Sequence, residues 1–418
     1  MNSNTEAPAA TADFDVVIAG GGLVGGSLAI ALGESGLRVA LVEAVPAASD
    51  QQPSFDARSI ALSHGSCRIL TQLGVWAHLQ EAVWPVREIH VSEQGRFGTT
   101  LIDAAEQGIE QLGHVIQAHA LGEALWARIR ECSSLTVFCP ARVTTTVAPR
   151  GGQRQLSLTT ADGTAQTLNT RLLAIADGAR SPLRQAVGIT ASERDYAQVA
   201  VICGVQVAPR YAGHRAFERF TPTGPLAVLP GPDGRYTAVL ARPAERATAL
   251  LAETDAEYLA RLQRLCGWRL GRLQRIGPRV SYPLALTTAA SLTAPRAVLI
   301  GNAANSLHPV AGQGFNLGLR DVASLAELLV AAGRAAGDPG SPALLDQYAE
   351  WRSADQRAVV RFTDSLIRVF GVRATGLAAA RGLALSLFDL SVTGKRALAR
   401  QTMGLAGRMT RLGRGLPL

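Results

Sequence analysis

Residues 14 to 43 restrict the fold more than any other part of the sequence. A β-branched, apolar run from Phe14 to Ala19 predicts a buried strand, and it leads directly into a glycine-rich turn. A helical pattern follows from residue 26 to 35, and a second apolar strand runs from residue 38 to 42. The marked positions in this pattern are Gly20, Gly22, Gly25 and, at the end of the second strand, Glu43. A strand, a glycine turn, a helix, a strand and an acid in this order predict a dinucleotide-binding α/β fold.

Each glycine has its own task in such a turn. Gly20 makes the tight turn, Gly22 lets a pyrophosphate approach the backbone, and Gly25 lets the helix pack on the strand. Glu43 is predicted to accept hydrogen bonds from an adenosine ribose. The pattern is shared by NAD-binding and FAD-binding proteins, so it leaves both cofactors open.

Three further positions carry groups that suit a bound nucleotide. Asp177 and Gly178 follow an apolar run, and a turn at such a strand end lies at the edge of a nucleotide crevice. Arg58 carries a guanidinium that can bind a phosphate, and Gln117 stands at the predicted start of a helix. Each position also has a plainer interpretation, as a turn, a surface arginine and a helix cap.

A second strand–loop–helix unit ends within Gly301 to Asp321. His308-Pro309 is a stiff, extended dipeptide, and the turn Gly312-Gln313-Gly314 precedes an amphipathic helix that begins near Phe315. The unpaired N–H groups at a helix start suit an anion or an electron-rich ring edge. An ordinary strand–loop–helix unit would show the same pattern, so the rest of the chain must indicate the ligand.

The middle of the chain changes character. Between residues 194 and 282, short alternating apolar runs are split by Pro and Gly, which predicts a largely antiparallel sheet, with one helical pattern at 252–265. At 418 residues and 47% hydrophobic, the chain can bury two cores. The predicted fold class is therefore α/β, a Rossmann-like domain with an inserted antiparallel sheet and a helical C-terminus. The predicted boundaries are 13–80, 115–185 and 285–365 for the nucleotide domain, 81–114 and 186–284 for the inserted domain, and 366–418 for a basic amphipathic segment.

The positive charge gathers at the C-terminal end. The formal net charge is +8, and from Leu366 onward nine basic residues stand against one acidic residue, Asp389. Leucines such as Leu383 and Leu387 alternate with the arginines, a mixture that suits an anionic membrane surface or a protein partner. A solvated helix packed on its own domain is an equal alternative. Nucleic acid is not a predicted partner, because no spread basic surface or known motif is present.

Cysteine usage and hydropathy indicate a cytoplasmic protein. The five cysteines show no CxxC and no metal-ligand spacing, which predicts reduced thiols and no metal site. No run of about 18 uncharged apolar residues predicts a transmembrane helix. Met1 to Ala12 lacks a basic region followed by an apolar one, so it is interpreted as a tail and not as a signal peptide. Peripheral attachment to the inner membrane face through the basic tail is the accompanying hypothesis.

Three separated segments together resemble the class A flavoprotein aromatic hydroxylases, which are FAD-dependent monooxygenases of the p-hydroxybenzoate hydroxylase (GR2-type) fold. They are GGGLVG with Glu43, ADGARS at 176–181 and GNAANSLHPVAGQGFNLGLRD at 301–321. The resemblance spans residues 14 to 370 and is closest to the ubiquinone-biosynthesis branch, within it to the 2-octaprenyl-6-methoxyphenol hydroxylases. The segments that carry this narrower resemblance are DARSIALS (56–63), AFERFTPTGPLAVLP (216–230), GWRLG (267–271) and SYPLAL (281–286).

The resemblance implies FAD as the cofactor and assigns it to matching positions. The residues implied for the ADP half, the pyrophosphate, the ribityl chain and transient NAD(P)H contact are Gly20, Gly22, Gly25, Glu43, Arg58, Gln117, Asp177 and Gly178. Asn302 stands where the wider family has an Asp that binds a ribityl hydroxyl. An amide keeps one acceptor oxygen and adds a donor, so the contact survives without the charge. The polyprenyl-methoxyphenol branch resembles this chain in having Asn there.

The flavin ring is implied to lie against residues 308–316. Pro309 would stand beside the ring where oxygen adds, and His308 and Gln313 complete the set implied nearest the reaction, His308 in a mainly structural role. The groups implied near flavin N1 and O2, where N–H donors stabilise negative charge on the reduced ring, belong to Gly312, Gly314, Phe315 and Asn316.

The implied reaction is aromatic hydroxylation. NAD(P)H reduces FAD, O₂ adds at flavin C4a, and the hydroperoxide attacks the ring of a polyprenylated methoxyphenol in ubiquinone biosynthesis. The implied partners are that phenol, O₂, and a membrane surface or other quinone-biosynthesis proteins at the basic tail. A sister hydroxylase acting at another ring position and a non-catalytic FAD-bound subunit of a quinone-synthesis assembly are the alternatives. A pyridine nucleotide–disulfide reductase would need a second GxGxxG and a redox Cys pair, and the sequence has neither.

Overall fold

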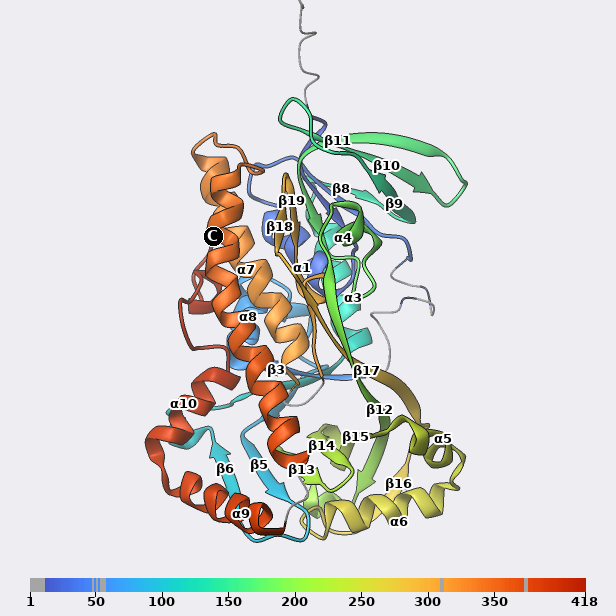
Figure 1. The fold of residues 1–418 in the computed structure, drawn as a ribbon, viewed down its shortest axis with the longest axis vertical. Helices are drawn as coiled ribbons and strands as arrows, with labels where there is room; N and C mark the ends of the chain where they lie inside the picture. Colours follow the sequence, from blue (N-terminus) through green and yellow to red (C-terminus); the bar gives the residue numbers. More distant parts are fainter. Residues whose placement is uncertain (1–11, 47–48, 50–51, 53–57, 309–311, 372–374) are drawn as a thin grey trace, which may run out of the picture.

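The chain folds into an α/β part at one end and an antiparallel sheet at the other, as Figure 1 shows. The computed structural model describes residues 12–418 apart from 47–48, 50–51, 53–57, 309–311 and 372–374.

The first sheet has eight strands and a parallel centre. Its strands are β1 (Phe14–Ala19), β2 (Val39–Val42), β8 (Leu135–Phe138), β9 (Ala141–Thr146), β10 (Arg154–Thr160), β11 (Ala165–Ile175), β18 (Thr293–Ala294) and β19 (Ala297–Leu299). Their order is β18-β19-β11-β1-β2-β8, with β10 and β9 extending from β11. The neighbours from β19 to β8 run parallel, so their carboxyl ends meet at one edge.

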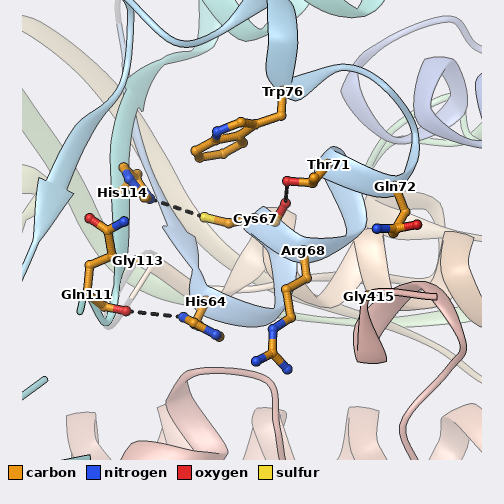
Figure 2. Close-up of a pocket in the computed structure, with 10 residues that line it drawn as sticks. All are labelled: His64, Cys67, Arg68, Thr71, Gln72, Trp76, Gln111, Gly113, His114 and Gly415. Atoms are coloured by element: carbon orange, nitrogen blue, oxygen red, sulfur yellow. Dashed lines mark hydrogen bonds between the residues drawn. The ribbon is translucent and has the colours of Figure 1, made fainter. Parts of the chain in front are cut away.

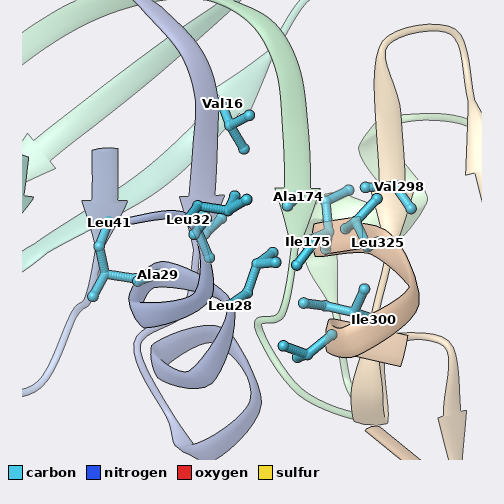
Figure 3. Close-up of a cluster of buried hydrophobic side chains, with 14 of the residues drawn as sticks. Val16, Leu28, Ala29, Leu32, Leu41, Ala174, Ile175, Val298, Ile300 and Leu325 are labelled. Carbon is cyan, nitrogen blue, oxygen red and sulfur yellow. The ribbon is translucent and has the colours of Figure 1, made fainter. Parts of the chain in front are cut away.

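Helices cover this sheet and close its core. The four long ones are α1 (Leu23–Leu32), α3 (Ala118–Glu131), α7 (Gln313–Arg334) and α8 (Pro342–Gly371). Figure 3 shows Leu28 and Leu32 of α1 gathered with Ile175 of β11 and Leu325 of α7 in one cluster. All four side chains are almost fully buried, and burying one leucine of this kind contributes about 1.5–3 kcal/mol. β1 is apolar on both faces because helices lie on both sides of a central parallel strand.

The second sheet has nine strands and is almost entirely antiparallel. Its strands are β5 (Glu88–Glu93), β6 (Thr99–Asp103), β12 (Ala191–Val207), β13 (Arg215–Thr221), β14 (Gly224–Pro230), β15 (Arg235–Pro243), β16 (Leu273–Ile276), β17 (Val280–Ala289) and β20 (Asn305–Ser306). The order is β20-β17-β12-β15-β14-β13-β5-β6, with β16 beside β12; β13 and β5 are parallel. Helices α5 (Ala244–Ala252) and α6 (Asp255–Cys266) cover one face, where Tyr258 and Leu262 are fully buried.

The β12–β17 ladder connects the two parts of the molecule. β12 pairs with β17 from Ala191 to Ile202, and the register shifts between Asp195 and Gln198. Ala197 takes a positive φ of 52° at this bulge. A bulge re-aims the side chains next to it. It turns Tyr196 toward the loop that precedes α7, where its ring meets His308.

A small third sheet joins the α/β part of the molecule to the antiparallel sheet. It contains β3 (Ser59–Ser63), β7 (Gly113–Gln117) and β4 (Trp84–Val86). Helix α2 (His64–Gln72) starts directly after β3, and Ser63 caps it by accepting the N–H of Ser66. The remaining short elements are α4 (Pro182–Ala186) and the 3-10 turns η1 (Trp76–His78), η2 (Ala105–Gln107), η3 (Pro209–Tyr211), η4 (Pro232–Gly234), η5 (Gly301–Ala303) and η7 (Leu412–Arg414).

The C-terminal region packs on both parts of the molecule. Helices α9 (Thr375–Leu390) and α10 (Val392–Thr402) lie beside β6, where Asp389 accepts the Leu101 N–H at 2.8 Å. The chain then returns to the α/β part, where the Gly65 N–H donates to Met403 O at 3.0 Å and Leu412 enters the main core. In the described part of the chain, no helix has both the length and the apolar character that crossing a membrane requires.

Most predicted elements are present, with two differences. Helix α1 begins at Leu23, three residues before the predicted start, because Gly22 already serves as its N-cap. Helix α5 was not predicted; it is a short, alanine-rich helix of nine residues that directly follows β15. The predicted domain boundaries stay a prediction, because β12 and β17 run through both parts.

Candidate functional site

Four loops meet at the carboxyl edge of the parallel strands. They follow β1 at Gly20, β2 at Glu43, β11 at Asp177 and β19 at Gly301. Ladder-like backbone hydrogen bonds continue past the strand ends, from Gly20 N to Val42 O at 2.8 Å and from Ala176 N to Ala19 O at 2.8 Å. This edge is where open α/β sheets bind ligands, so three predicted positions come together where the chemistry requires them.

The glycine turn is closely packed against its neighbours. Gly20 has φ +105°, and a Cβ there would lie 2.5 Å from Ala176 O. A Cβ on Gly25 would lie 1.8 Å from Gly20 O, so only glycine lets α1 cross β1 this closely. Gly22 caps α1 without a side-chain hydrogen bond, which leaves the first N–H groups of the helix available to an anion.

Glu43 holds the turn in place. Its Oε2 accepts the Gly21 N–H and its Oε1 accepts the Val45 N–H at 2.8 Å, and the side chain is buried. The carboxylate therefore lies at the end of β2 as predicted, with part of its hydrogen-bonding capacity used by the protein.

Asp177 keeps one oxygen for a ligand. Its Oδ2 accepts the Leu183 N–H at 3.3 Å, whereas its Oδ1 is buried and has no hydrogen-bond partner among the described residues. Burial raises the pKa of this carboxyl above its ordinary value. A buried acceptor without a partner fits a ligand rich in hydroxyl groups, which is what the ribityl chain and ribose of FAD offer. The following Gly178 takes φ +95°, as a sharp turn there requires.

Arg184 joins two of these loops, and no sequence motif indicated this role. Its Nη1 donates to Ala179 O at 3.1 Å and to Ala303 O at 3.0 Å, and the side chain is buried. Its position three residues after Ser181, the N-cap of the short helix α4, was the available signal.

The loop after β19 is held in place by residues of α7 and α8. Gly301 has φ +59°, and its N–H donates to Asp321 Oδ2 at 3.1 Å. Asp321 is paired in turn with Arg352 at 2.7 Å, inside the core. Asn302 lies in η5 and is exposed, so its amide is available to a ligand. Sequence reasoning found Asn302 but missed the two buried residues that support it.

His308 is buried and neutral. Its ring meets that of Tyr196 edge-on at 5.2 Å between centroids, and its Nε2 lies 3.3 Å from Gln198 Oε1. Burial lowers the pKa of His308 to about 4. An imidazole with so low a pKa is a weak base, which favours the structural role predicted for it. Pro309 lies outside the described residues.

The start of α7 offers backbone groups more than side chains. Gly312 is its N-cap with φ +59° and has no side-chain cap. Asn316 accepts from Ser63 N at 2.9 Å and donates to Ala61 O at 2.8 Å, so its amide ties α7 to β3. Gln313 Nε2 donates to Thr402 O at 3.3 Å, toward the C-terminal segment.

The remaining positions in this turn differ in how open they are. A Cβ on Gly314 would meet nothing within 4 Å, whereas Phe315 packs partly against the main core. The ring-facing role of N–H groups at the start of α7 stays a prediction, based on the positive end of the helix dipole.

Arg58 and Gln117 come together on the third sheet. Residue 59 pairs with Gln117 across β3 and β7, and Ala118 N donates to Arg58 O at 2.8 Å. The Arg58 guanidinium lies 4.8 Å above the ring of Tyr282 on β17. Gln117 is exposed and stands at the N-cap position of α3, although its side chain makes no capping hydrogen bond.

A separate cavity of 280 Å³ lies beside α2, and Figure 2 shows its lining. Cys67 Sγ is 3.4 Å from His114 Nδ1 there, and the His114 ring stands edge-on to Trp76. Burial raises the pKa of the Cys67 thiol to about 12 and lowers that of His114 to about 4. Both groups are therefore neutral, which does not suit a thiolate nucleophile. None of the predicted site residues lines this cavity.

The chain matches known proteins along nearly its whole length. The family described as FAD binding domain matches residues 13–363. Ubiquinone hydroxylase UbiL of Rhodospirillum rubrum is 37% identical over 408 residues, which cover 97% of this chain and 93% of that protein. The 3-demethoxyubiquinol 3-hydroxylase of Escherichia coli is 30% identical over 396 residues, which cover 94% and 98%. The crystal structure of p-nitrophenol 4-monooxygenase PnpA from Pseudomonas putida has a TM-score of 0.78 at 20% identity, covers 95% of this chain and 99% of that one, and confirms the predicted fold class.

Proposed function

This chain belongs to the FAD binding domain family of FAD-dependent monooxygenases, and we propose that it hydroxylates the aromatic ring of a polyprenylated methoxyphenol in ubiquinone biosynthesis. The observation that carries the proposal is the buried Oδ1 of Asp177, without a partner among the described residues, at the edge where four loops meet. The relatives named for ubiquinone hydroxylation, which align along nearly the whole chain, support the substrate class.

Each loop has a share in holding FAD in this proposal. The N–H groups at the start of α1 bind the pyrophosphate, Glu43 and Asp177 accept hydroxyl groups, and Asn302 contacts the ribityl chain. The N–H groups at the start of α7 lie against the electron-rich end of the ring. When bound, FAD supplies the redox and oxygen-activating chemistry, with NAD(P)H as reductant and O₂ as oxidant.

The substrate ring is proposed to lie between the α7 loop and the antiparallel sheet. His308 faces this boundary with Tyr196 and Gln198 from the β12 bulge, and Arg58 reaches Tyr282 on β17. These contacts hold the two parts together, and a closed boundary excludes water from the reacting atoms. The neutral imidazole of His308 positions the loop in this proposal and leaves deprotonation of the phenol to another group.

The test uses purified holoenzyme with 2-polyprenyl-6-methoxyphenol. We expect a yellow protein whose NAD(P)H oxidation accelerates when the phenol is added, and a product that mass spectrometry and NMR identify as the ring-hydroxylated benzoquinol. A bound flavin that NAD(P)H never reduces would favour a non-catalytic subunit. Hydroxylation at another carbon would favour a sister enzyme, an alternative that the similarity to a 3-hydroxylase keeps open.

We also propose that α9 rests on an anionic lipid surface, which would bring the enzyme to a prenylated substrate. Leu383, Leu387 and Leu390 recur on one side of α9 and are 57%, 58% and 78% exposed. The adjoining α10 adds the exposed arginines Arg396 and Arg400. Exposed leucines next to basic side chains are typical of helices that lie in the membrane interface.

A further inference from the structure

A second cavity lies beside helix α7, next to Arg320 and Ser324. Its volume is 520 Å³, and it is bounded by α7, α8, the start of α2 and residues 404–413. None of the residues proposed above to hold FAD or substrate lines it. Its lining includes two arginines on neighbouring helices, Arg320 of α7 and Arg352 of α8.

Arg352 enters the cavity with one donor unused. Its side chain is 4% exposed; its Nε donates to Asp321 and its Nη1 to Asp355 Oδ2 at 2.8 Å. Its Nη2 is buried and has no hydrogen-bond partner among the described residues. A buried guanidinium N–H without an acceptor costs free energy, so such groups usually meet a ligand or water.

Arg320 leaves more donors unused. Its Nε donates to the same Asp355 Oδ2 at 2.8 Å, while its Nη1 and Nη2 are buried and have no partner among the described residues. Gly404 allows the opposite wall to come close, since a Cβ on it would lie 3.1 Å from Arg320 Nη1. Asp355 Oδ2 thus accepts a hydrogen bond from each guanidinium group, and Nη1 and Nη2 of Arg320 and Nη2 of Arg352 have no partner among the described residues.

The charges around the cavity balance, so the attraction for an anion comes from directed N–H donors and not from a net positive charge. The lining contains three guanidinium groups, Arg320, Arg352 and Arg408, and two carboxylates, Glu350 and Asp355. A third carboxylate, Asp321, lies behind Arg352. Arg408 stacks on the ring of Trp351 at 3.8 Å, a contact that leaves its charge in place.

We propose that this cavity binds a small oxyanion, a carboxylate or phosphate group, through the unpaired N–H groups of Arg320 and Arg352. Planar guanidinium groups offer several N–H donors in a fixed fork, which matches the oxygens of such groups better than it matches a single water. The site shares no lining residue with the groups proposed above to hold FAD or substrate, although Arg352 also pairs with Asp321, which supports the Gly301 loop. It would persist if the substrate assignment failed.

The test is isothermal titration of the holoenzyme with inorganic phosphate and, separately, with acetate, at ionic strength held constant with sodium chloride. Arg320→Lys keeps a charge beside Asp355 but removes the fork, and Arg334→Lys near the end of the same helix is the matched control outside the cavity. Loss of one charged hydrogen-bonding group should weaken binding by about tenfold or more. The control should bind as the unchanged protein does.

A second variant guards against a folding effect. Ala358 lines the cavity from an exposed position on α8, so Ala358→Glu places a competing carboxylate at its mouth without disturbing the core. Flavin content and melting temperature are measured for every variant. Saturable binding of either anion that both cavity variants weaken supports the proposal, and the preferred anion tells tetrahedral from planar recognition. No saturable binding of either anion, or unchanged affinity in either cavity variant, overturns it.

Discussion

Asp321 and Arg352 form an ion pair of 2.7 Å in which the two side chains are 1% and 4% exposed. The same carboxylate accepts the N–H of Gly301, so the pair reaches from the helical layer to the loop that carries Asn302. Gln356 adds a third hydrogen bond at 3.0 Å. The loop proposed to hold the ribityl chain is thus supported by charges buried in the protein core.

Replacing one member of this pair should destabilise the fold strongly. Asp321→Asn leaves the Arg352 charge buried with less compensation, and breaking a buried pair in this way costs about 3–5 kcal/mol. Urea denaturation followed by circular dichroism measures the loss. Arg235→Ala is the control, because its pair with Asp233 is 64% and 83% exposed and should contribute less than about 1 kcal/mol. If both variants lowered the free energy of unfolding equally, the proposed stabilisation by the buried ion pair would be contradicted.

The glycine turn should tolerate no methyl group at Gly25. A Cβ there overlaps Gly20 O at 1.8 Å, so Gly25→Ala must push α1 away from β1 and distort the proposed pyrophosphate site. We expect the purified variant to lose most of its FAD, measured as the ratio of flavin absorbance to protein. Gly204→Ala on β12 is the matched control, since a Cβ there meets nothing within 4 Å. Full flavin content in Gly25→Ala would show that the turn does not hold the cofactor.

Removing the unpaired acceptor at Asp177 should weaken FAD binding. Asp177→Ala is expected to raise the dissociation constant for FAD roughly tenfold to a hundredfold, the usual effect of losing a hydrogen bond to a charged group. Reconstitution of apoprotein, followed by flavin fluorescence, gives the constant. Asp177→Asn keeps an acceptor for the Leu183 N–H and should lose less affinity. An alanine variant with unchanged affinity would remove this residue from the site.

Acidification should destabilise the protein partly through His308. Its pKa is about 4 in the folded protein and about 6.5 when unfolded, so the unfolded chain takes up the proton first. The stabilising contribution is complete above pH 6.5 and is lost as the pH falls toward 4, by about 3 kcal/mol in all. Urea unfolding of His308→Gln between pH 6.5 and 4 should show a smaller loss of unfolding free energy per pH unit than the unchanged protein shows. A residual slope is expected from His90 and His114, whose pKa values are also lowered to about 4.

The exposed leucines of α9 should govern lipid binding. The double change Leu383→Glu with Leu387→Glu removes apolar area and adds repulsion from anionic headgroups, so co-sedimentation with anionic vesicles should fall by about tenfold or more. Val147→Glu changes an equally exposed residue on the loop after β9 and serves as control. Vesicle binding that survives the double change would reject α9 as the lipid-facing element.

Local sequence patterns predicted the elements whose formation depends on residues that are neighbours along the chain. β1 was placed from Phe14 to Ala19, as found, because an apolar run before a glycine turn has few alternatives. The family match from 13 to 363 confirms the resemblance drawn from three separated motifs. The contacts between distant segments could not be predicted, because nothing local to Arg184 indicates that it will donate to Ala303 O.

The sequence indicated the positions of candidate residues better than it indicated their hydrogen-bond and ion-pair partners. The start of α7 was expected to present N–H groups to the cofactor, and the sequence did not indicate that the side-chain amide of Asn316 would hydrogen-bond to β3 and α2. The basic tail was expected either to meet a membrane or partner surface or to pack on its own domain, and the sequence did not indicate that Lys395 is buried against Glu106 at 2.8 Å or that Arg381 pairs with Glu93. A single sequence shows which groups are present, whereas their pairing depends on the tertiary fold.

The return of the chain after α10 has a consequence for how the protein is made. Gly65 donates its N–H to Met403 O, and these residues are separated by more than three hundred others. At a synthesis rate of about 5–20 residues per second, a ribosome needs roughly 17 to 70 seconds to travel from one to the other. During that interval the start of α2 lacks this neighbour, so the contact forms only when synthesis is nearly finished.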